Sequence, residues 1–245
     1  MSANNRLGPK EVLIFTSTPN EYRSVSGYVG RQKFEKLAPS VINCGAGRIH
    51  ATFSVANELT PRLAANTPPI AMVGAGTSGS LSLHLKQGDV IVSNSAIITD
   101  WRMENEDEVL LSPYGVFEYL ALDPPHLEKM VIECRHPLIV GLMEKLPPNG
   151  FQRGRLLTSE AFVSGKTRKL KLGSDFGCLA CDMESGVYGH LGNRLVNVPW
   201  FNVRVVADTL DETLGDYFAK ERDMTDILAQ KIVEILQIFD SSLDE

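Results

Sequence analysis

The chain has few of the residues from which metal and redox sites are built. Its 245 residues include four cysteines, and the one close pair, Cys178-x-x-Cys181, lacks the second half of a zinc site. The residues around this pair are apolar, so we expect both thiols to be buried in a strand. The five histidines show no metal-ligand spacing. We therefore expect neither a metal nor another cofactor.

Motifs of several large enzyme classes are also missing. The sequence has no G-x-S-x-G elbow, which argues against serine-based hydrolysis. Two glycine-rich segments, 45–47 and 74–79, follow predicted strands, but neither has the lysine of a P-loop and neither reads G-x-G-x-x-G with an acidic partner. We expect both segments to be tight turns whose backbone N–H groups approach phosphate or sugar oxygens of a ligand.

Long hydrophobic runs and an excess of positive charge are absent as well. The first apolar run covers only Val12 to Phe15, which is too short for a signal sequence or a membrane span. We therefore expect a cytoplasmic protein with no membrane partner. The net charge of −6, with 22% charged residues, argues against nucleic acid as the main partner.

What the sequence does contain is an alternation of short apolar runs with longer amphipathic ones. This pattern is typical of strands and helices interleaved around a mostly parallel sheet. No linker divides the chain, so the sequence predicts one α/β domain over residues 1-245, with a central mixed, mostly parallel twisted sheet flanked by helices. The predicted strands cover residues 12–16, 41–44, 69–73, 89–93, 179–183 and 198–206, and residues 156–159, followed by 161–163, are predicted as a further strand that runs into a loop.

The predicted helices follow from apolar residues at helical spacing. They are a helix from Ile49 that ends at Pro61, one over 126–134, one over 184–191, and a C-terminal helix over 224–239 with a cap at Thr225. Residues 104–123 are acidic, turn-rich and non-periodic. Such an insertion is a functional loop, a subunit contact or a mobile cover, and the sequence does not choose among these.

Three carboxylates, Glu21, Glu184 and Asp208, follow predicted strands. Ligands of open α/β sheets bind outside the carboxyl ends of the strands, so residues far apart in sequence can converge there. Each carboxylate also has a purely structural interpretation. Glu21 and Glu184 suit the first turn of a helix, and Asp208 could cap a helix beside the capping-box pattern Thr209-x-x-Glu212. The residues alone leave both interpretations open.

Taken together, these segments resemble the nucleoside phosphorylase and nucleosidase superfamily, and most closely the methylthioadenosine/S-adenosylhomocysteine nucleosidases. The resemblance spans almost the whole chain, and the order and spacing of its motifs make chance similarity improbable. It implies the nucleoside phosphorylase-like three-layer sandwich. The motifs that carry it are Thr18-Pro19-Asn20-Glu21, Cys44-Gly45-Ala46-Gly47-Arg48, Gly76-Thr77-Ser78-Gly79-Ser80-Leu81, Lys86-Gln87-Gly88-Asp89-Val90, Ser159-Glu160-Ala161-Phe162, Asp182-Met183-Glu184 and Arg204-Val205-Val206-Ala207-Asp208.

The resemblance implies that water hydrolyses the N-glycosidic bond of a purine nucleoside. Asp208 would protonate the base at N7 and accept from an exocyclic amino group, which requires a raised pKa in a dry site. Glu21 would hold and deprotonate the water, with Arg204 and Thr77 orienting it. Because a cation within an apolar strand is costly unless it is paired, Arg204 also needs a nearby carboxylate or bound water.

The same resemblance implies the residues that hold the substrate. Glu184 would bind the ribose hydroxyls and Met183 would pack against the ribose. Phe162 would stack on the purine, and the backbone at Val163 would bind its edge. Ala46 would face the 5′ substituent.

The sequence departs from the family pattern at three places. Phosphorolytic relatives carry an arginine where this chain has Met72-Val73-Gly74-Ala75, which favours hydrolysis over phosphorolysis. Ala207 stands where the nucleosidases usually have a serine that supports the acid. Ala46 is smaller than the usual residue, so the 5′ pocket is expected to be roomier, and the substrate is methylthioadenosine, S-adenosylhomocysteine or a close relative.

Two other functions stay open, a phosphorolytic purine nucleoside phosphorylase and a non-catalytic nucleoside-binding module. Members of the family usually form dimers or larger assemblies in which a neighbouring subunit helps to close the 5′ pocket. We therefore expect a homodimer or larger homo-oligomer, and residues 97–117, with Trp101, Tyr114 and Phe117, are the candidate contact. A mobile surface loop is the alternative for this stretch.

Overall fold

The computed structural model describes residues 8–99, 102–104, 109–111, 131–193, 197–212 and 214–243. Its centre is a ten-stranded sheet, in which the order of hydrogen-bonded neighbours is β8-β5-β10-β11-β3-β12-β4-β9, and β1 joins β2 to the side of β3. The strands of this sheet are β1 (Lys10–Thr16), β2 (Leu37–Asn43), β3 (Ala71–Ser80), β4 (Val90–Ser93), β5 (Ser95–Ile98), β8 (Ile132–Glu133), β9 (Gln152–Arg153), β10 (Arg155–Thr158), β11 (Cys178–Asp182) and β12 (Trp200–Asp208). A separate hairpin pairs β6 (Arg102–Glu104) with β7 (Val109–Leu111).

The sheet contains two groups of parallel strands that run in opposite directions, while β4 and β8 pair antiparallel with β12 and β5 at their outer sides. In one part β2, β1, β3 and β12 are parallel, and in the other β5, β10 and β11 are parallel. The two parts meet antiparallel where β11 pairs with the last residues of β3. As a result, the loop after β11 points back along β3 toward the carboxyl end of β1.

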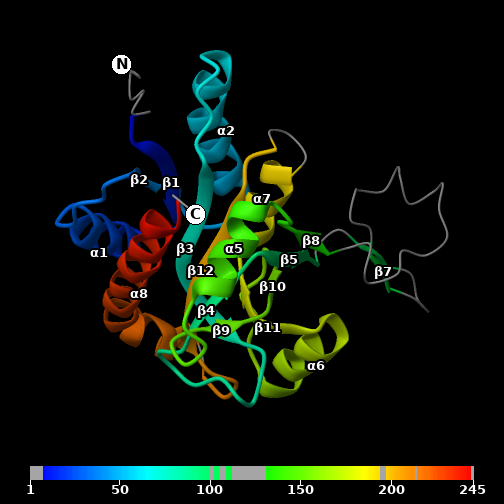
Figure 1. The fold of residues 1–245 in the computed structure, drawn as a ribbon. Helices are drawn as coiled ribbons and strands as arrows, with labels where there is room; N and C mark the ends of the chain where they lie inside the picture. The colour runs from blue at the N-terminus through cyan, green and yellow to red at the C-terminus, as the bar shows by residue number, and fades with distance from the viewer. Residues whose placement is uncertain are drawn as a thin grey trace, which may run out of the picture.

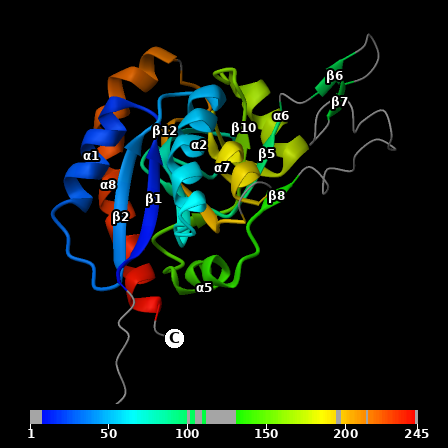
Figure 2. The same ribbon diagram turned by 90° about the horizontal axis from the view of Figure 1, so that it is seen from above.

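Helices cover both faces of this sheet. α1 (Pro19–Val29) packs on α8 (Leu214–Ser242), which lies against β3 and β12, while α2 (Arg48–Ala64) packs on α7 (Ser185–Leu191) on the other side. Figure 2 shows the pair α1 and α8 to the left of β1 and the pair α2 and α7 to the right. The remaining helices are α5 (Pro137–Lys145) and α6 (Lys166–Phe176), which lies against β11 near the bottom of Figure 1. The predicted fold class is confirmed.

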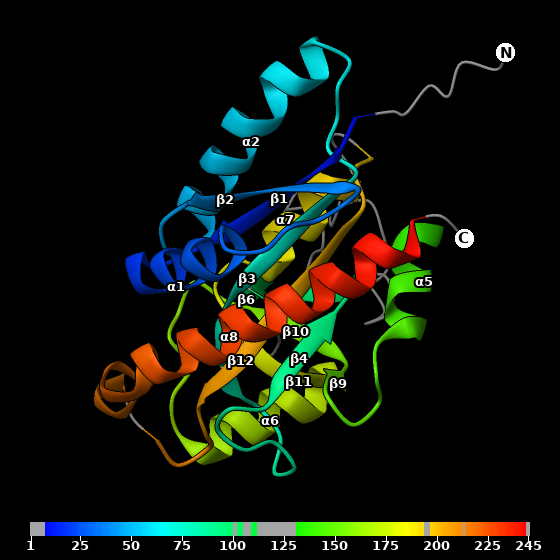
Figure 3. The ribbon, with the colours of Figure 1, turned by 60° about the vertical axis from the view of Figure 1, so that its left-hand side comes forward.

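The hydrophobic core forms from the β-branched and aromatic runs that identify the strands in the sequence. Every residue of β3, β4 and β12 is buried, as expected for strands covered on both faces. The apolar side of α8 packs against this core through Leu228, Ile232, Leu236 and Phe239. Figure 3 shows α8 in front of the sheet, where it packs on β12 and β3.

One prediction about the glycine-rich segments is wrong. Residues 74–79 are part of β3 and do not form a turn. The missing side chains leave room for others to lie against the strand, because a Cβ at Gly74 would meet Asn202 and Tyr188, and one at Gly76 would meet the guanidinium of Arg204. By contrast, Gly45 and Gly47 have φ values of 84° and 90° and form the predicted turn after β2.

Three predicted helix features also differ from the structure. α2 continues through Pro61 to Ala64, and Arg62 stabilises its last turn by bonding the Glu58 carbonyl at 2.6 Å and the Glu11 carboxylate. Thr225 lies inside α8, where its hydroxyl donates to the Arg222 carbonyl, so it is not a cap. Residues 132–133 form β8, which pairs with β5, and not the end of a helix.

The candidate subunit contact cannot be compared with the structure. Trp101, Tyr114 and Phe117 lie outside the described residues, as does most of the 104–123 insertion. Among the residues that the structure describes, no helix combines the length and apolar character needed to cross a bilayer.

Candidate active site

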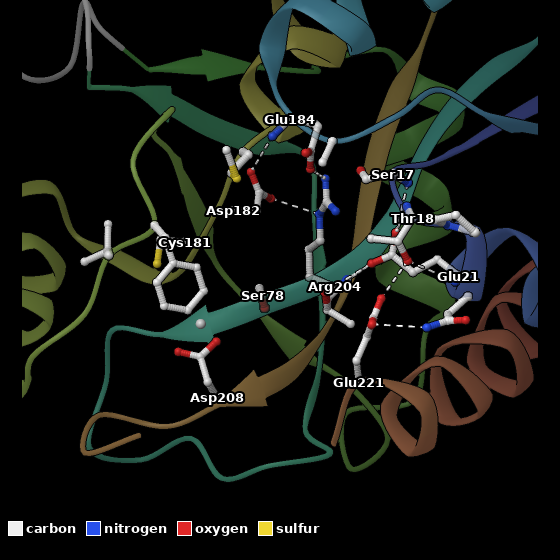
Figure 4. Close-up of a pocket in the computed structure, with 18 of the residues that line it drawn as sticks. Ser17, Thr18, Glu21, Ser78, Cys181, Asp182, Glu184, Arg204, Asp208 and Glu221 are labelled. Carbon is white, nitrogen blue, oxygen red and sulfur yellow. Dashed lines mark hydrogen bonds and ion pairs between the residues drawn. The ribbon is translucent and has the colours of Figure 1, made fainter. Parts of the chain in front are cut away.

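A cavity of about 610 Å³ lies where the two parallel parts of the sheet meet. It is bounded by the loops that follow β1, β2, β10 and β11 and by the ends of β3 and β12. All nine residues that the sequence assigned to a site line this cavity: Glu21, Ala46, Thr77, Phe162, Val163, Met183, Glu184, Arg204 and Asp208. Figure 4 shows Glu184 and Arg204 together, with Glu21 beside Arg204 and Asp208 on another side of the cavity.

Glu21 is buried and has four hydrogen-bond donors. One carboxylate oxygen accepts from the backbone N–H groups of Ser17 and Thr18 at 2.9 and 3.0 Å. The other accepts from the N–H and hydroxyl of Thr77 at 2.8 and 3.1 Å. Glu21 also completes a capping box with Thr18 at the start of α1. Glu21 therefore belongs to the first turn of α1 and also lines the cavity.

The hydroxyl of Thr77 is the one donor to Glu21 that can move without a change in the backbone. Three of the four donors to Glu21 are backbone N–H groups held by β3 and by the residues that lead into α1, whereas the Thr77 hydroxyl can rotate. A water molecule could therefore bond to Glu21 in place of that hydroxyl without moving the backbone. The arrangement suits a carboxylate that must hold and release a small ligand.

Arg204 forms ion pairs with carboxylates on the side of the cavity opposite Asp208. Its Nε lies 2.9 Å from Asp182 Oδ2 and donates to the Ser185 hydroxyl at 3.0 Å, and its Nη2 lies 3.5 Å from Glu184 Oε2. The guanidinium is almost completely buried. Burial alone would lower its pKa, but Asp182 and then Glu184 reverse that effect and raise the pKa above the ordinary value. Arg204 is thus a permanent cation that orients two carboxylates.

Glu184 projects from the start of α7 toward the turn after β2. Its Oε1 accepts from the N–H of Gly47 at 2.8 Å. It does not cap its own helix, because Asp182 takes the free N–H groups of Glu184 and Ser185 at 3.1 and 3.0 Å. Burial raises the pKa of Glu184 to about 7, although Arg204 favours the charged form.

Asp208 is the last residue of β12, and a local irregularity directs it into the cavity. The register with β3 shifts between Val206 and Asp208, so Ala207 is an extra residue at the strand end. The carboxylate lies against Gly79, where a Cβ would stand 2.9 Å from Oδ2. Burial raises its pKa, and a hydrogen bond from Lys169 partly offsets that effect.

The remaining predicted residues surround the space between these carboxylates. Val163 is buried, whereas Phe162 is 39% exposed at the mouth of the cavity. Met183 lies between the strand end and Glu184, and Ala46 belongs to the glycine turn after β2. The apolar surface of these four side chains suits the faces of a flat, ring-shaped ligand.

The sequence reasoning misses several charged residues at or beside the cavity, and Arg23, Asp182 and Glu221 are among those that line it. Asp182 could have been found, since it stands two residues before Glu184 in the motif Asp182-Met183-Glu184. Glu221 lines the cavity and accepts from Thr18 Oγ1 at 2.7 Å and from Asn20 at 3.2 Å, but it comes from α8, whose pattern shows only core packing. Lys169 lies within a basic run that is typical of a solvated helix face.

One residue of the cysteine pair, Cys181, lines the cavity. Cys178 and Cys181 are buried in β11, as predicted, and burial raises the pKa of each thiol to about 12. Within the described ranges, no group of three or more His, Cys, Asp or Glu side chains could hold a metal ion.

Comparisons with known proteins agree with the resemblance found in the sequence. The 5′-methylthioadenosine/S-adenosylhomocysteine nucleosidase of an Exiguobacterium species is 24% identical over 218 residues, covering 86% of this chain and 83% of that protein. The enzyme of the same name from Buchnera aphidicola is 23% identical over 207 residues, covering 83% of this chain and 80% of that protein.

Solved structures match over nearly the whole chain. A Helicobacter pylori 5′-methylthioadenosine/S-adenosylhomocysteine nucleosidase has a TM-score of 0.73 at 18% identity, covering 94% of this chain and 99% of that one. The futalosine hydrolase of Helicobacter pylori also has a TM-score of 0.73 at 18% identity, covering 93% and 97%. A family model, described as the phosphorylase superfamily, matches residues 16–239. The chain therefore belongs to the phosphorylase superfamily.

Proposed function

We propose that the protein hydrolyses the N-glycosidic bond of a 5′-substituted adenine nucleoside and releases adenine and the free sugar. The observation that supports this function most directly is the placement of three buried carboxylates, Glu21, Glu184 and Asp208, around one cavity. Glycoside hydrolysis needs one acid for the leaving group and one carboxylate for water. A third carboxylate suits the ribose hydroxyls, which are hydrogen-bond donors.

The proposed reaction begins with proton transfer to the base. Asp208, whose neutral form is favoured because burial raises its pKa, gives its proton to N7 of adenine, and the C1′–N9 electron pair leaves with the base. The sugar becomes an oxocarbenium-like species that nearby negative charge stabilises. Glu21 removes a proton from water as its oxygen bonds to C1′, and Thr77 yields its place on Glu21 to that water. Solvent then reprotonates Asp208 and deprotonates Glu21.

The substrate would lie between these groups in one orientation. Glu184 accepts hydrogen bonds from the ribose hydroxyls, Phe162 stacks on the purine, and Met183 packs on the sugar. In this proposal Arg204 acts mainly through the ribose side of the site, because its ion pairs are with Asp182 and Glu184. Its influence on the water at Glu21 is then electrostatic.

Hydrolysis is favoured over phosphorolysis by the charges around the water position. Residues 72–75 of β3 are buried and carry no cation, and the four donors on Glu21 keep a carboxylate where phosphate would have to bind. Arg204 is already paired with two carboxylates. Arg23 also lines the cavity, so phosphorolysis is the alternative that one observation supports.

The first test is a product assay with methylthioadenosine, S-adenosylhomocysteine, 5′-deoxyadenosine and an aminofutalosine-like nucleoside, each with and without phosphate. We expect free adenine from at least one of the adenine nucleosides at a rate independent of phosphate. Dependence on phosphate with release of a sugar 1-phosphate would identify a phosphorylase instead. Tight binding by calorimetry without any product would identify a non-catalytic binding module.

We also propose that the protein works as a homodimer or larger homo-oligomer. Ile49 and Phe53 lie one turn apart on α2 and are 79% and 67% exposed, and α2 begins two residues after Ala46, which lines the cavity. A second copy that covers these side chains would also adjoin the cavity. Light scattering should show that Phe53→Lys shifts the protein toward monomer. Leu83→Lys, at an equally exposed position elsewhere, should have no effect, and a wild-type monomer would refute the proposal.

A further inference from the structure

The first turn of α6 carries a lysine with an unusual environment. Lys169 is completely buried, and its Nζ donates to Asp208 Oδ2 at 2.5 Å and to the Thr209 carbonyl at 2.6 Å. A second link between the same elements joins Lys166 to Asp211 at 3.0 Å on the surface. The start of α6 is thus held against the strand end that carries the candidate acid.

Stability alone does not explain this buried pair. Lysine is seldom fully buried, and burying an ammonium beside a carboxyl group gives little net stabilisation because the charged group loses its hydration. The other titratable groups near Asp208 do not replace the cation. Burial raises the pKa of the Cys181 thiol to about 12 and keeps it neutral, while Glu212 is negative and paired with Lys220.

We propose that Lys169 is a positioning residue for the reaction of Asp208. Its ammonium fixes Oδ2, leaves Oδ1 for the base, and balances the negative charge that remains on the carboxylate after the proton has passed to adenine. The neighbouring Ala207 has no side-chain hydrogen bond to offer, so this support comes from α6. The inference rests on the proposed hydrolase function, because it assigns Lys169 a part in that reaction.

The physical reason is a balance between two opposing effects on Asp208. Burial raises the pKa of the carboxyl group and so favours its neutral form, whereas the cation of Lys169 favours the carboxylate that the proton transfer produces. A general acid works best when its pKa lies near the working pH. Removing the charge of Lys169 should therefore move the pKa of Asp208 upward and weaken the acid.

The test combines activity with a direct titration of the carboxyl group. Lys169→Met removes the charge and keeps the length of the side chain, Lys169→Arg keeps the charge, and Lys166→Met is the matched control on the same helix. The pH dependence of kcat is measured for each variant. In parallel, infrared spectroscopy of the substrate-free protein follows the carboxyl band of Asp208, assigned by its loss in Asp208→Asn.

In Lys169→Met we expect the carboxyl band of Asp208 to disappear at a pH that is higher than in wild type by about one unit or more, and the alkaline limb of kcat to shift upward with it. We expect kcat at neutral pH to fall at least tenfold. Lys169→Arg should restore the wild-type limb, and Lys166→Met should match wild type. If Lys169→Met does not fold, Lys169→Gln removes the charge while keeping an N–H donor.

Two results would overturn the inference. One is a lower melting temperature in the neutral variants with the band and the limb unmoved, which would mean a merely structural role. The other is loss of activity in every Lys169 variant with no change in the carboxyl titration. If no nucleoside is cleaved by the wild type, the proposed function fails, and the infrared titration still decides whether Lys169 sets the protonation of Asp208.

Discussion

Glu21 and Asp208 show how neighbours decide what a carboxylate does. Glu21 completes a capping box and also reaches Thr77 across the cavity wall, so local structure and site use the same side chain. Asp208 does not cap the following backbone, because the N–H of Thr209 donates to Glu212 at 2.5 Å and the Asp208 carboxylate contacts Lys169 instead. Asp208, which the sequence allowed as a helix cap, is therefore left free of that role and available for chemistry.

The proposed role of Asp208 predicts a specific loss. Asp208→Asn keeps the size of the side chain but removes the transferable proton, so turnover should fall by roughly two or more orders of magnitude while the substrate still binds. Adenine release and calorimetry measure the two quantities. Asp211→Asn, which changes an exposed aspartate three residues away, should behave as wild type. Unchanged turnover in Asp208→Asn would remove this residue from the mechanism.

The element that does most to shape the site is β3. Its glycines have no side chains to fill the cavity, so Arg204 and Asp208 of the neighbouring β12 can lie directly over its backbone. A strand with ordinary side chains would pair equally well but would leave no room for these groups. The glycine-rich sequence therefore serves close packing between side chains and backbone, a use that glycine in a strand commonly has.

This view of β3 predicts the effect of a single methyl group. In Gly76→Ala the new Cβ would collide with the guanidinium of Arg204, which is buried and cannot swing into solvent, so we expect a loss of about 1–3 kcal/mol in the free energy of unfolding. Urea denaturation measures it. The control is Gly141→Ala in α5, where the structure leaves open space and alanine should be neutral or stabilising. Equal stability of both variants would contradict the packing argument.

At the scale of the whole molecule, the site depends on the meeting of two parallel sheet parts. The sequence reasoning placed all strand ends on one edge, as in an ordinary parallel sheet. In the structure β11 is antiparallel to β3, and this reversal brings Asp182 and Glu184 alongside Arg204 of β12. The buried charges that result link folding to pH.

The pKa of Glu184 predicts how stability changes with pH. Because burial raises this pKa from 4.5 to about 7, the folded protein binds more protons than the unfolded chain between these values. The stabilising contribution of Glu184 is complete below about pH 4.5 and is lost as the pH rises through about 7. Glu184→Gln cannot titrate, so its free energy of unfolding should fall less between acidic and slightly alkaline pH than that of wild type. Glu234→Gln, at a surface ion pair, should keep the wild-type slope.

Some of these structural features can be predicted from the sequence, and others cannot. Strand cores such as residues 12–16 and 179–183 are predicted because β-branched and apolar runs are a local signal. The course of α2 through Pro61 is not, because it depends on Arg62 bonding to Glu11 on a distant strand. Likewise, nothing local marks Lys169 as buried within a basic helix turn.

The sequence by itself determined the alternation of strands and helices, the family, and nine of the residues that line the cavity, because runs, motifs and their spacing are properties of the chain. The tertiary structure decided which charged side chains contact each other. Lys169 meets Asp208, and Arg204 meets Asp182 and Glu184, only because strands and helices far apart in sequence pack together. Burial raises the pKa of Glu184 and of Asp208, nearby charges alter it further, and both causes arise only when the chain is folded.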